Sequence, residues 1–552
     1  MKISTSLIVG ALLSCLTFSL CDPSARTAEV QDSDRPANRD AAPSAEKRGA
    51  DREDRSARPD GDRGGQGQTR SDERSKGGSE RGNSGGERGK GGSERGKGKG
   101  GSGLGNYTTP PPANQVPDHL YNIILGRPTD RGVTIRVLFH KDAAVQLNYG
   151  SDPGKLDAKT SQVTMKAKGT HDFVLDSLKP NRRYYYQLAY QIESGTRQSS
   201  DTYTFHTQRA IGSSFVFTVT SDSHLDENTS GEVYLRTLAN ALHDSPDFHF
   251  ELGDTFMTGK YVRPEYSEPQ YLAQRYYLGS LCHSAALFFA LGNHDGESGG
   301  RGSMTWATRK RKELIPNPFP DGFYTGNEQM EGGLGVPEDY YQWQWGDAQF
   351  MVLDPFRYTK GRGNGGDHWS WTLGERQYQW LSKSLKESKA KYKFIFLHHL
   401  VGGTPPHARG GVEAAPFWEW GGKGASGESE FAKYRAGWEA PIHELLVKHG
   451  ATIVFHGHDH MFIKQDLDGV VYQLVPQPGH PRSGNTRTAA EYGYVSGEKQ
   501  GSSGHIRVHV ASDRVRVDYV RAYLPKGESA TSRNGEVSFS YVAPGESSKL
   551  AP

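Results

Sequence analysis

The 552-residue chain has few cysteines, and this limits how its folded part can be held together. Only Cys15, Cys21 and Cys282 are present, and the first two lie in an N-terminal apolar segment. A disulfide framework is therefore excluded for the folded part. Any metal site must be built from His, Asp, Asn and Glu, which are ligands for hard to borderline cations.

The chain also lacks a large excess of either charge, and one long stretch lacks aromatic residues. The formal net charge is only +2, which argues against a nucleic-acid binder. Residues 22–106 contain no Phe, Trp or Tyr and consist mostly of Gly, Ser and charged residues, with near-repeats at Gly77 and Gly91. Such a composition cannot bury enough apolar surface to offset the entropy of ordering. We predict a disordered tether over residues 22–115; an RGG-like nucleic-acid segment is the disfavoured alternative.

The first 21 residues are typical of an export signal. One lysine precedes the apolar run Leu7–Leu13, which is too short to span a membrane comfortably. Leu12 to Cys15 is similar to a lipoprotein box, with Cys15 as the lipidated residue and lipid anchor. Cleavage before Asp22 without lipidation remains the alternative. Either route predicts a periplasmic, cell-surface or extracellular protein.

Residues 116–209 have short alternating strands separated by turn residues. Val133–Phe139 alternates as a half-buried strand, and further strands are expected near 173–175, 184–188 and 203–205. This spacing predicts an all-β sandwich. The run from Leu178 to Tyr184 resembles the tyrosine corner of fibronectin type III domains. No catalytic groups gather here, so we interpret this segment as a spacer and packing partner.

From residue 213 to about 525, strands alternate with helices, and 526–552 is expected to be a tail. This order predicts an α/β body. Helices are expected at Gly231–His243, from a Thr372–Glu375 capping box to about Ser388, and at Trp438–Lys448. Strands are expected at residues 215–219, 247–250, 287–291, 350–353 and 393–397, and another begins at residue 452. Three later strands, at residues 470–474, 506–510 and 515–520, are expected to be antiparallel.

Polar side chains gather where these strands end. The strand from Thr452 ends in His456-Gly-His-Asp-His460, and other strands end in similar short motifs. Open α/β sheets place their ligand sites at strand ends, and neutral imidazole is a common metal ligand. The predicted ligands are Asp222, His224, Asp254, Asn293, His398, His458 and His460. The mixture suits two divalent or trivalent cations, such as Fe, Zn or Mn, with Asp254 bridging them. A surface histidine cluster is the alternative.

As a set, the strand-end motifs resemble the calcineurin-like metallophosphoesterase superfamily, over most of Phe215 to about Val520. The resemblance implies a four-layer αββα sandwich, with two mixed sheets between helices. It implies one metal held by Asp222, His224, Asp254 and His460, and another by Asp254, Asn293, His398 and His458. It also implies that metal-bound hydroxide attacks phosphorus in line. His294, oriented by Asp295, would then stabilise or protonate the leaving oxygen.

The sandwich placed before this body resembles the N-terminal domain of purple acid phosphatases, including the segment Ile124–Pro128. Two departures matter. Those enzymes have Gly where this chain has His224, and a metal-bound Tyr where this chain has Met257. The resemblance therefore implies a phosphatase of this architecture whose first metal is bound by histidine and whose solutions are not purple.

Two further assignments concern the neighbourhood of the predicted centre. His399 replaces His398 as the ligand if the alignment of the motif shifts by one residue. The long Gly-, Pro- and aromatic-rich stretch Gly402–Lys423 either forms a wall of the substrate pocket or is a packed surface loop. In the first case Arg409, Glu413 and Lys423 are the predicted substrate-binding residues.

These patterns predict a secreted or surface-tethered dinuclear phosphoesterase that hydrolyses small phosphate monoesters. A phosphodiesterase acting on nucleotides or lipid headgroups is the first alternative. A non-catalytic metal-binding surface protein is the second, and the intact Asn293, His294 and Asp295 argue against it.

Overall fold

The computed structural model describes residues 105–299, 302–361, 368–482 and 484–543. The predicted export segment, with Cys15 and Cys21, and residues 22–104 of the predicted tether lie outside these ranges. Within the described ranges, Cys282 is a buried free thiol. None of the helices described is both long enough and apolar enough to cross a membrane.

Residues 121–206 form an all-β sandwich of two antiparallel sheets, as the strand spacing predicts. One sheet has the order β1-β2-β6, and the other β4-β3-β7-β8, with β5 on β3 and β9 on β7. The strands are β1 Tyr121–Gly126, β2 Val133–Phe139, β3 Ala143–Gly150, β4 Ala158–Lys159, β5 Val163–Met165, β6 Thr170–Leu175, β7 Arg183–Ile192, β8 Gln198–Ser199 and β9 Tyr203–His206. The hydroxyl of Tyr184 accepts a hydrogen bond from the Lys179 backbone N–H at 2.8 Å, the geometry expected of a tyrosine corner.

A six-stranded mixed sheet begins the α/β body, with the order β12-β11-β10-β21-β22-β23. Its first three strands run parallel, so their carboxyl ends meet at one edge. The strands are β10 Phe215–Thr220, β11 Phe248–Glu251, β12 Ala286–Phe289, β21 Gly504–Val510, β22 Val515–Arg521 and β23 Val537–Ala543.

An eight-stranded sheet faces it, with the order β13-β14-β15-β16-β17-β19-β18-β20. Strands β15, β16, β17 and β19 are parallel neighbours, and this parallel run again gathers carboxyl ends at one edge. The strands are β13 Thr325–Gly326, β14 Tyr341–Trp345, β15 Ala348–Val352, β16 Tyr392–Phe396, β17 Ile453–His456, β18 Phe462–Leu467, β19 Val470–Leu474 and β20 Glu498–Gln500.

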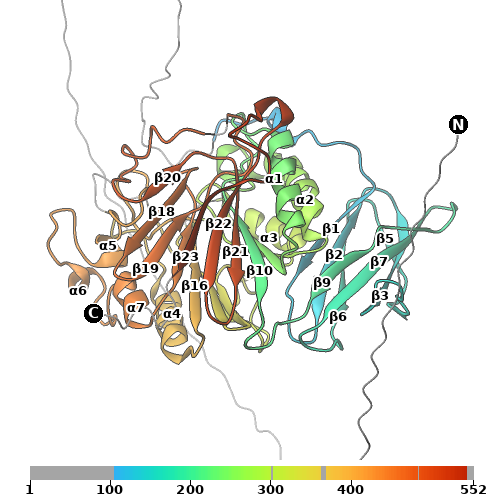
Figure 1. Cartoon of the computed structure of the whole chain (residues 1–552), viewed down its shortest axis with the longest axis horizontal. Helices are drawn as coiled ribbons and strands as arrows, with labels where there is room; N and C mark the ends of the chain where they lie inside the picture. The colour runs from blue at the N-terminus through green and yellow to red at the C-terminus, as the bar shows by residue number, and fades with distance from the viewer. Residues whose placement is uncertain (1–104, 300–301, 362–367, 483, 544–552) are drawn as a thin grey trace, which may run out of the picture. The chain divides into compact units, whose positions relative to one another are not determined.

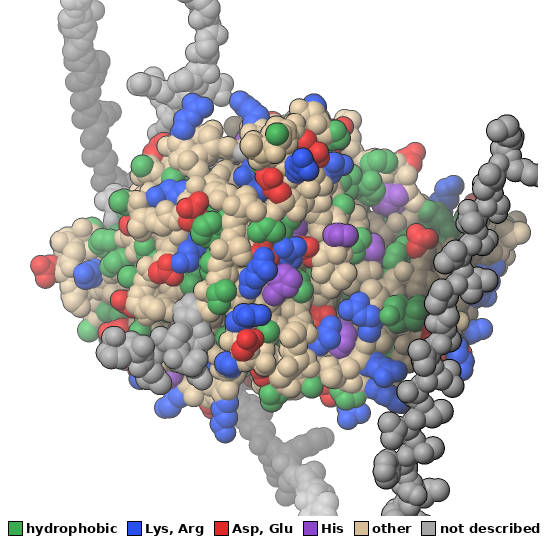
Figure 2. Space-filling view, viewed as in Figure 1, with side chains coloured by type: hydrophobic (Ala, Val, Ile, Leu, Met, Phe, Trp, Pro, Cys, Tyr) green, Lys and Arg blue, Asp and Glu red, His purple; other side chains and the backbone are tan. Residues whose placement is uncertain are grey.

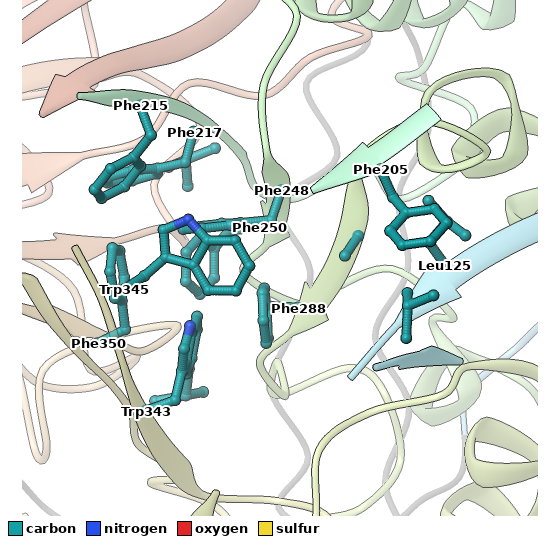
Figure 3. Close-up of a cluster of buried hydrophobic side chains, with 14 of the residues drawn as sticks. Leu125, Phe205, Phe215, Phe217, Phe248, Phe250, Phe288, Trp343, Trp345 and Phe350 are labelled. Atoms are coloured by element: carbon teal, nitrogen blue, oxygen red, sulfur yellow. The ribbon is translucent and has the colours of Figure 1, made fainter. Parts of the chain in front are cut away.

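Aromatic side chains fill the space between the two sheets. Phe250 of β11 stacks on Phe396 of β16, with ring centroids 3.8 Å apart and planes 11° apart. Phe217, Phe288 and Trp343 extend the same layer, which Figure 3 shows as a closely packed group. Alternate residues of each strand supply this layer, because successive side chains of a strand point to opposite faces.

Helices cover the outer faces of the two sheets, which completes the predicted four-layer arrangement (Figure 1). Helices α1 and α2 lie side by side over the six-stranded sheet, and α4 and α7 lie over the other. The helices are α1 Gly231–His243, α2 Glu268–Cys282, α3 Met304–Leu314, α4 Glu375–Glu387, α5 Trp418–Gly421, α6 Phe431–Tyr434 and α7 Ile442–Lys448. Short 3-10 turns are η1 Pro112–Asn114, η2 Thr258–Lys260, η3 Pro264–Ser267 and η4 Pro525–Gly527.

Helix α2 also joins the sandwich to the α/β body. Its buried Arg275 donates a hydrogen bond through Nε to Asn122 Oδ1 at 2.6 Å and another through a terminal nitrogen to the Arg136 carbonyl at 3.1 Å. On the face shown in Figure 2, basic and acidic side chains are interspersed rather than separated into patches.

Four sequence-based boundaries differ from the structure. Residues 526–552 are not only a tail, because β23 pairs with β22 along its length. The predicted tether ends earlier than residue 115, since the chain is already packed at residues 105–115. The capping box is wrong: α4 begins after Gly374, which has a positive φ, and Thr372 Oγ1 accepts from the Gly374 N–H instead. Helix α7 begins at Ile442 rather than Trp438, because Pro441 precedes it in an extended conformation.

Candidate metal centre

The strand-end motifs come together where the parallel edges of both sheets meet. Asp222 and His224 follow β10, Asp254 follows β11, and Asn293 follows β12. From the facing sheet, His398 follows β16, and His458 and His460 follow β17. Backbone hydrogen bonds join these loops, including Asp222 N–H to the Gly253 carbonyl at 2.9 Å and Gly457 N–H to the His398 carbonyl at 2.8 Å.

Six of the predicted ligands form two groups with the spacing of metal sites. One group contains Asp222, His224 and His460, and the other contains Asp254, His398 and His458. Within each group, one candidate ligand atom per residue lies within 4.8 Å of the others. In the first group, Asp222 Oδ1 lies 3.2 Å from His460 Nε2 and 3.6 Å from His224 Nε2.

Asp254, a member of the second group, also faces the first. Its Oδ2 is 3.4 Å from His398 Nε2 and 3.8 Å from His224 Nε2, so one carboxylate faces a histidine of each group. In the second group, His398 Nε2 also lies 3.3 Å from His458 Nδ1. This placement suits the bridging role predicted for Asp254.

The residues present fit a pair of cations. The buried atoms Asp222 Oδ1, His224 Nε2 and Asn293 Oδ1 have no hydrogen-bond partner. Buried polar atoms normally have hydrogen-bond partners, so three predicted ligand atoms without one fit the role of donors to a cation. Oxygen and imidazole nitrogen donors are those that Zn, Fe and Mn accept.

The buried carboxylates of the centre also favour the binding of cations. Burial would lower the pKa of His398, but the negative charges of Asp254 and Asp222 raise it to about 10. Burial opposes ionisation of Asp222, yet the neighbouring His398 and His460 hold its pKa well below the usual range. The buried carboxylates thus need nearby positive charge, which bound cations would supply.

The backbone carries an unusual conformation at these ligands. Positive φ angles occur at five of them, in the left-handed region that non-glycine residues seldom adopt. They are Asp222 (60°), His224 (50°), Asp254 (54°), His458 (79°) and His460 (57°). Such conformations persist only where the surroundings enforce them, and they concentrate at functional sites.

Close approach of the loops explains two glycines of the motifs. A Cβ at Gly457 would lie 1.9 Å from Ser221 Oγ and 2.7 Å from Asp222 Oδ2. A Cβ at Gly292 would lie 2.0 Å from the backbone nitrogen of Asp254. Each glycine therefore lets one strand end approach another.

Several residues that orient the ligands were missed by the sequence analysis. His224 Nδ1 donates to Asp226 Oδ2 at 3.0 Å, and His398 Nδ1 donates to the Leu252 carbonyl at 2.8 Å, which leaves both Nε2 atoms facing the centre. Gln270 of α2 donates to the His224 carbonyl, and Gln274 donates to Ser223 Oγ at 3.0 Å. The spacing Asp222-x-His224-x-Asp226 could have indicated Asp226, whereas glutamines on a helix carry no such signal.

The two predicted catalytic residues differ in burial and in their contacts. His294 has a half-buried side chain, its ring lies 6.4 Å from that of His224, and its backbone N–H donates to Asp254 Oδ1 at 2.7 Å. Asp295 is fully buried, and its carboxylate accepts backbone N–H groups from Gly292, Asp254, Thr255 and Phe256 at 2.8–3.0 Å. These four bonds make Asp295 the anchor of the loops that follow β11 and β12.

The three predicted substrate-binding residues are not brought together. Arg409 pairs with Asp459, which lies between His458 and His460, and stacks over the ring of Tyr492. Glu413 accepts hydrogen bonds from Val495 N–H, Ser496 N–H and Gln465 Nε2, which fixes a neighbouring loop. Lys423 has an exposed side chain, and its backbone pairs with Phe417 and Ser429.

The stretch Gly402–Lys423 nevertheless reaches the centre through its backbone. The His407 carbonyl accepts a hydrogen bond from His458 Nε2 at 2.8 Å, which leaves His458 Nδ1 facing His398. Farther along the stretch, Trp418 and Trp420 are buried. His399 belongs to neither ligand group, and its ring lies 5.0 Å from Phe356, 4.9 Å from Trp371 and 5.2 Å from His458.

Two facing mixed sheets covered by helices, with two groups of oxygen and nitrogen ligands at their shared edge, define a dinuclear metallohydrolase. Residues 215–462 match the family model described as calcineurin-like phosphoesterase, so this domain belongs to that family. The chain is therefore a metallophosphoesterase that uses two metal ions. The expected superfamily and four-layer fold are confirmed.

Solved structures support the same fold beyond the matched domain. PhoD is similar with a TM-score of 0.54 at 15% identity, over 80% of this chain and 93% of PhoD. The purple acid phosphatase PPD1 from yellow lupin (Lupinus luteus) seeds has a TM-score of 0.51 at 14% identity, over 78% of this chain and 76% of its own. No curated protein matches the chain.

Proposed function

We propose that this metallophosphoesterase hydrolyses small phosphate monoesters, with His294 as the group that protonates the leaving oxygen. The observation that carries this proposal is the position of His294. Its backbone N–H is fixed to Asp254, and its half-buried side chain stands beside the ligand group of His224. It can thus reach a substrate held at the centre while remaining open to proton exchange with solvent.

Of the remaining residues of the centre, some would hold the cations and Asp295 positions the loop that carries His294. Asp222, His224 and His460 would hold one cation, Asp254, His398 and His458 the other, with Asn293 Oδ1 as an additional donor. When bound, the cations supply Lewis acidity that activates a water molecule and neutralises charge on the phosphoryl oxygens. Asp295 accepts the N–H groups of Gly292 and Asp254, which ties the loop that carries His294 to the loop after β11 and so holds the imidazole on an anchored backbone.

The first experiment compares monoester and diester turnover. We expect the metal-loaded enzyme to show a higher kcat/KM on p-nitrophenyl phosphate than on bis(p-nitrophenyl) phosphate. A preference for the diester would overturn the monoester assignment and favour the phosphodiesterase. Metal-dependent turnover of neither substrate, with both metals bound, would favour a non-catalytic surface protein.

The second experiment tests His294 itself. We expect His294→Ala to lower kcat by about 10²–10⁴, the usual contribution of general acid catalysis, while both metal equivalents remain. An alkyl phosphate should suffer more than p-nitrophenyl phosphate, because a low-pKa phenol needs little protonation. His243→Ala, at the exposed end of α1, is the matched control. Equal losses on both substrates would remove His294 from the acid role, and loss of one metal would make it a ligand.

We further propose that the enzyme is exported and acts on substrates outside the cytoplasm. The apolar run Leu7–Leu13 and the box ending at Cys15 support this proposal. Mass spectrometry of the cell-envelope and secreted fractions should find a mature chain that begins at Asp22 or an acylated chain that begins at Cys15. An intact Met1 in the active protein would contradict export.

A further inference from the structure

The first described residues of the chain are attached to the loops around the metal centre. Tyr107 N–H donates to the Lys260 carbonyl at 2.9 Å, and Val262 N–H donates to the Tyr107 carbonyl at 3.0 Å. The Tyr107 ring packs edge-on against Tyr261, with centroids 5.4 Å apart, and its hydroxyl donates to Glu227. One residue thus binds two loops that are far apart in sequence.

A second attachment follows seven residues later. The buried Asn114 donates through Nδ2 to the Leu225 carbonyl at 2.8 Å, and the Ala113 carbonyl accepts from the Tyr277 hydroxyl of α2 at 3.4 Å. We name residues 105–114 the N-terminal strap. Its two attachments, at Glu227 and at Leu225, lie on either side of Asp226.

Asp226 connects the strap to a predicted metal ligand. Its Oδ2 accepts from His224 Nδ1 at 3.0 Å and from Lys260 Nζ at 2.9 Å. Lys260 is the residue whose carbonyl binds Tyr107, so the strap contacts both loops that position this carboxylate. His224 and Leu225 both have positive φ angles, 50° and 54°, a backbone that needs outside contacts to persist.

We propose that the N-terminal strap is a positioning element of the metal group formed by Asp222, His224 and His460, with Tyr107 as its anchor. It fixes the loops on both sides of Asp226, and Asp226 in turn fixes the tautomer and orientation of His224. This proposal depends on the metal centre and not on the monoester preference, so the two can fail separately.

The test measures metal binding by the full chain rather than turnover. We expect Tyr107→Ala to weaken the binding of one metal equivalent by up to about 10-fold, the lower end of the effect of losing a direct partner of a ligand, because Tyr107 acts through the loops beside Asp226. The second equivalent should keep the parent affinity in competition with a chelator. Asp226→Asn should give the same pattern, because it acts on the same histidine. Tyr121→Ala, which removes a half-buried ring of the sandwich, is the control for general destabilisation.

The outcomes separate the strap from a merely structural segment. Parent affinity for both equivalents in Tyr107→Ala would overturn the proposal, and so would an equal loss in Tyr121→Ala. Should Tyr107→Ala fail to fold by circular dichroism, Tyr107→Phe, which removes only the hydroxyl, decides in its place. A selective loss of affinity for one equivalent then supports the strap, and unchanged affinity overturns it.

Discussion

At the scale of single residues, Asp254 is the carboxylate that both metal groups share. It faces His398 and His224 at 3.4 Å and 3.8 Å, and its second oxygen binds the His294 N–H. We expect Asp254→Asn to lose both metal equivalents together, because one negative charge serves both sites. Elemental analysis checks this, and two retained equivalents would contradict the bridging assignment.

Glu413 was predicted to bind substrate, whereas its hydrogen bonds indicate a role in holding a neighbouring loop, and a substitution distinguishes the two roles. Its carboxylate is bound to Val495, Ser496 and Gln465, so we expect Glu413→Ala to destabilise the protein by about 1–3 kcal/mol and to leave KM unchanged. Urea unfolding and steady-state kinetics give the two quantities. Lys423→Ala is the control from the same stretch and should change neither. A raised KM with parent stability would restore Glu413 as a substrate contact.

The sequence indicated the candidate ligands, which follow strands, but it did not indicate the residues that hydrogen-bond to the loops carrying these ligands. The six positions that the structure gathers into two groups were readable because each follows a strand closely, and parallel strands carry their ends to one edge. Gln270 and Gln274 were not readable, since their role depends on how α2 packs against the loops. The backbone contacts of Glu413 were not readable for a related reason: the groups that its carboxylate binds lie some 80 residues away in sequence.

At the scale of elements, the strand β23 shows that the polar composition of residues 526–552 did not reveal a strand within them. Val537–Ala543 alternates and is mostly half-exposed, as expected of an edge strand next to polar sequence. Its Tyr541 crosses to the facing sheet, where the hydroxyl donates to Gln473 Oε1 at 3.0 Å. The strands β12 and β16 were easier to predict, because burial on both faces makes them nearly continuous apolar runs.

A pair of truncations tests the contribution of β23. Ending the chain after Glu536 removes one of the two partners of β22 and the Tyr541 contact, so we expect a lower melting temperature and a tendency to aggregate through the exposed edge. Ending it after Ala543 should leave both properties at the parent values. Thermal unfolding and light scattering distinguish the two. Equal stability of the two truncations would show that residues 526–543 behave as a tail.

At the scale of the whole molecule, metal binding and folding are coupled. Only the folded chain brings the two ligand groups together, so bound metal stabilises it by about 4 kcal/mol at a free concentration a thousand times Kd. Removing the metals with a chelator should therefore lower the melting temperature, and added metal should restore it. Asp254→Asn is the control, whose melting temperature should respond little to metal. An equal response in parent and variant would place the stabilising metal elsewhere.

The polar N-terminal segment gives a second whole-molecule prediction. Deleting residues 22–104 from the mature chain should leave metal content and kcat unchanged, because that composition contributes no apolar core. Elemental analysis and turnover of a small substrate measure both. A large fall in kcat would mean that this segment takes part in the reaction.

The left-handed backbone at the five ligands determines the order of events when the protein is heated. Each such residue destabilises the fold by roughly 1 kcal/mol or more, and the conformation persists because the loops are attached to rigid sheets. The aromatic layer that joins the sheets thus helps the hydrogen bonds of Asp295 to keep the loops in this conformation. Warming should relax the loops before it separates the sheets, so metal escapes into a chelating dye at temperatures where far-ultraviolet circular dichroism is still native. Thinning the layer, as in Phe250→Leu, should widen that interval.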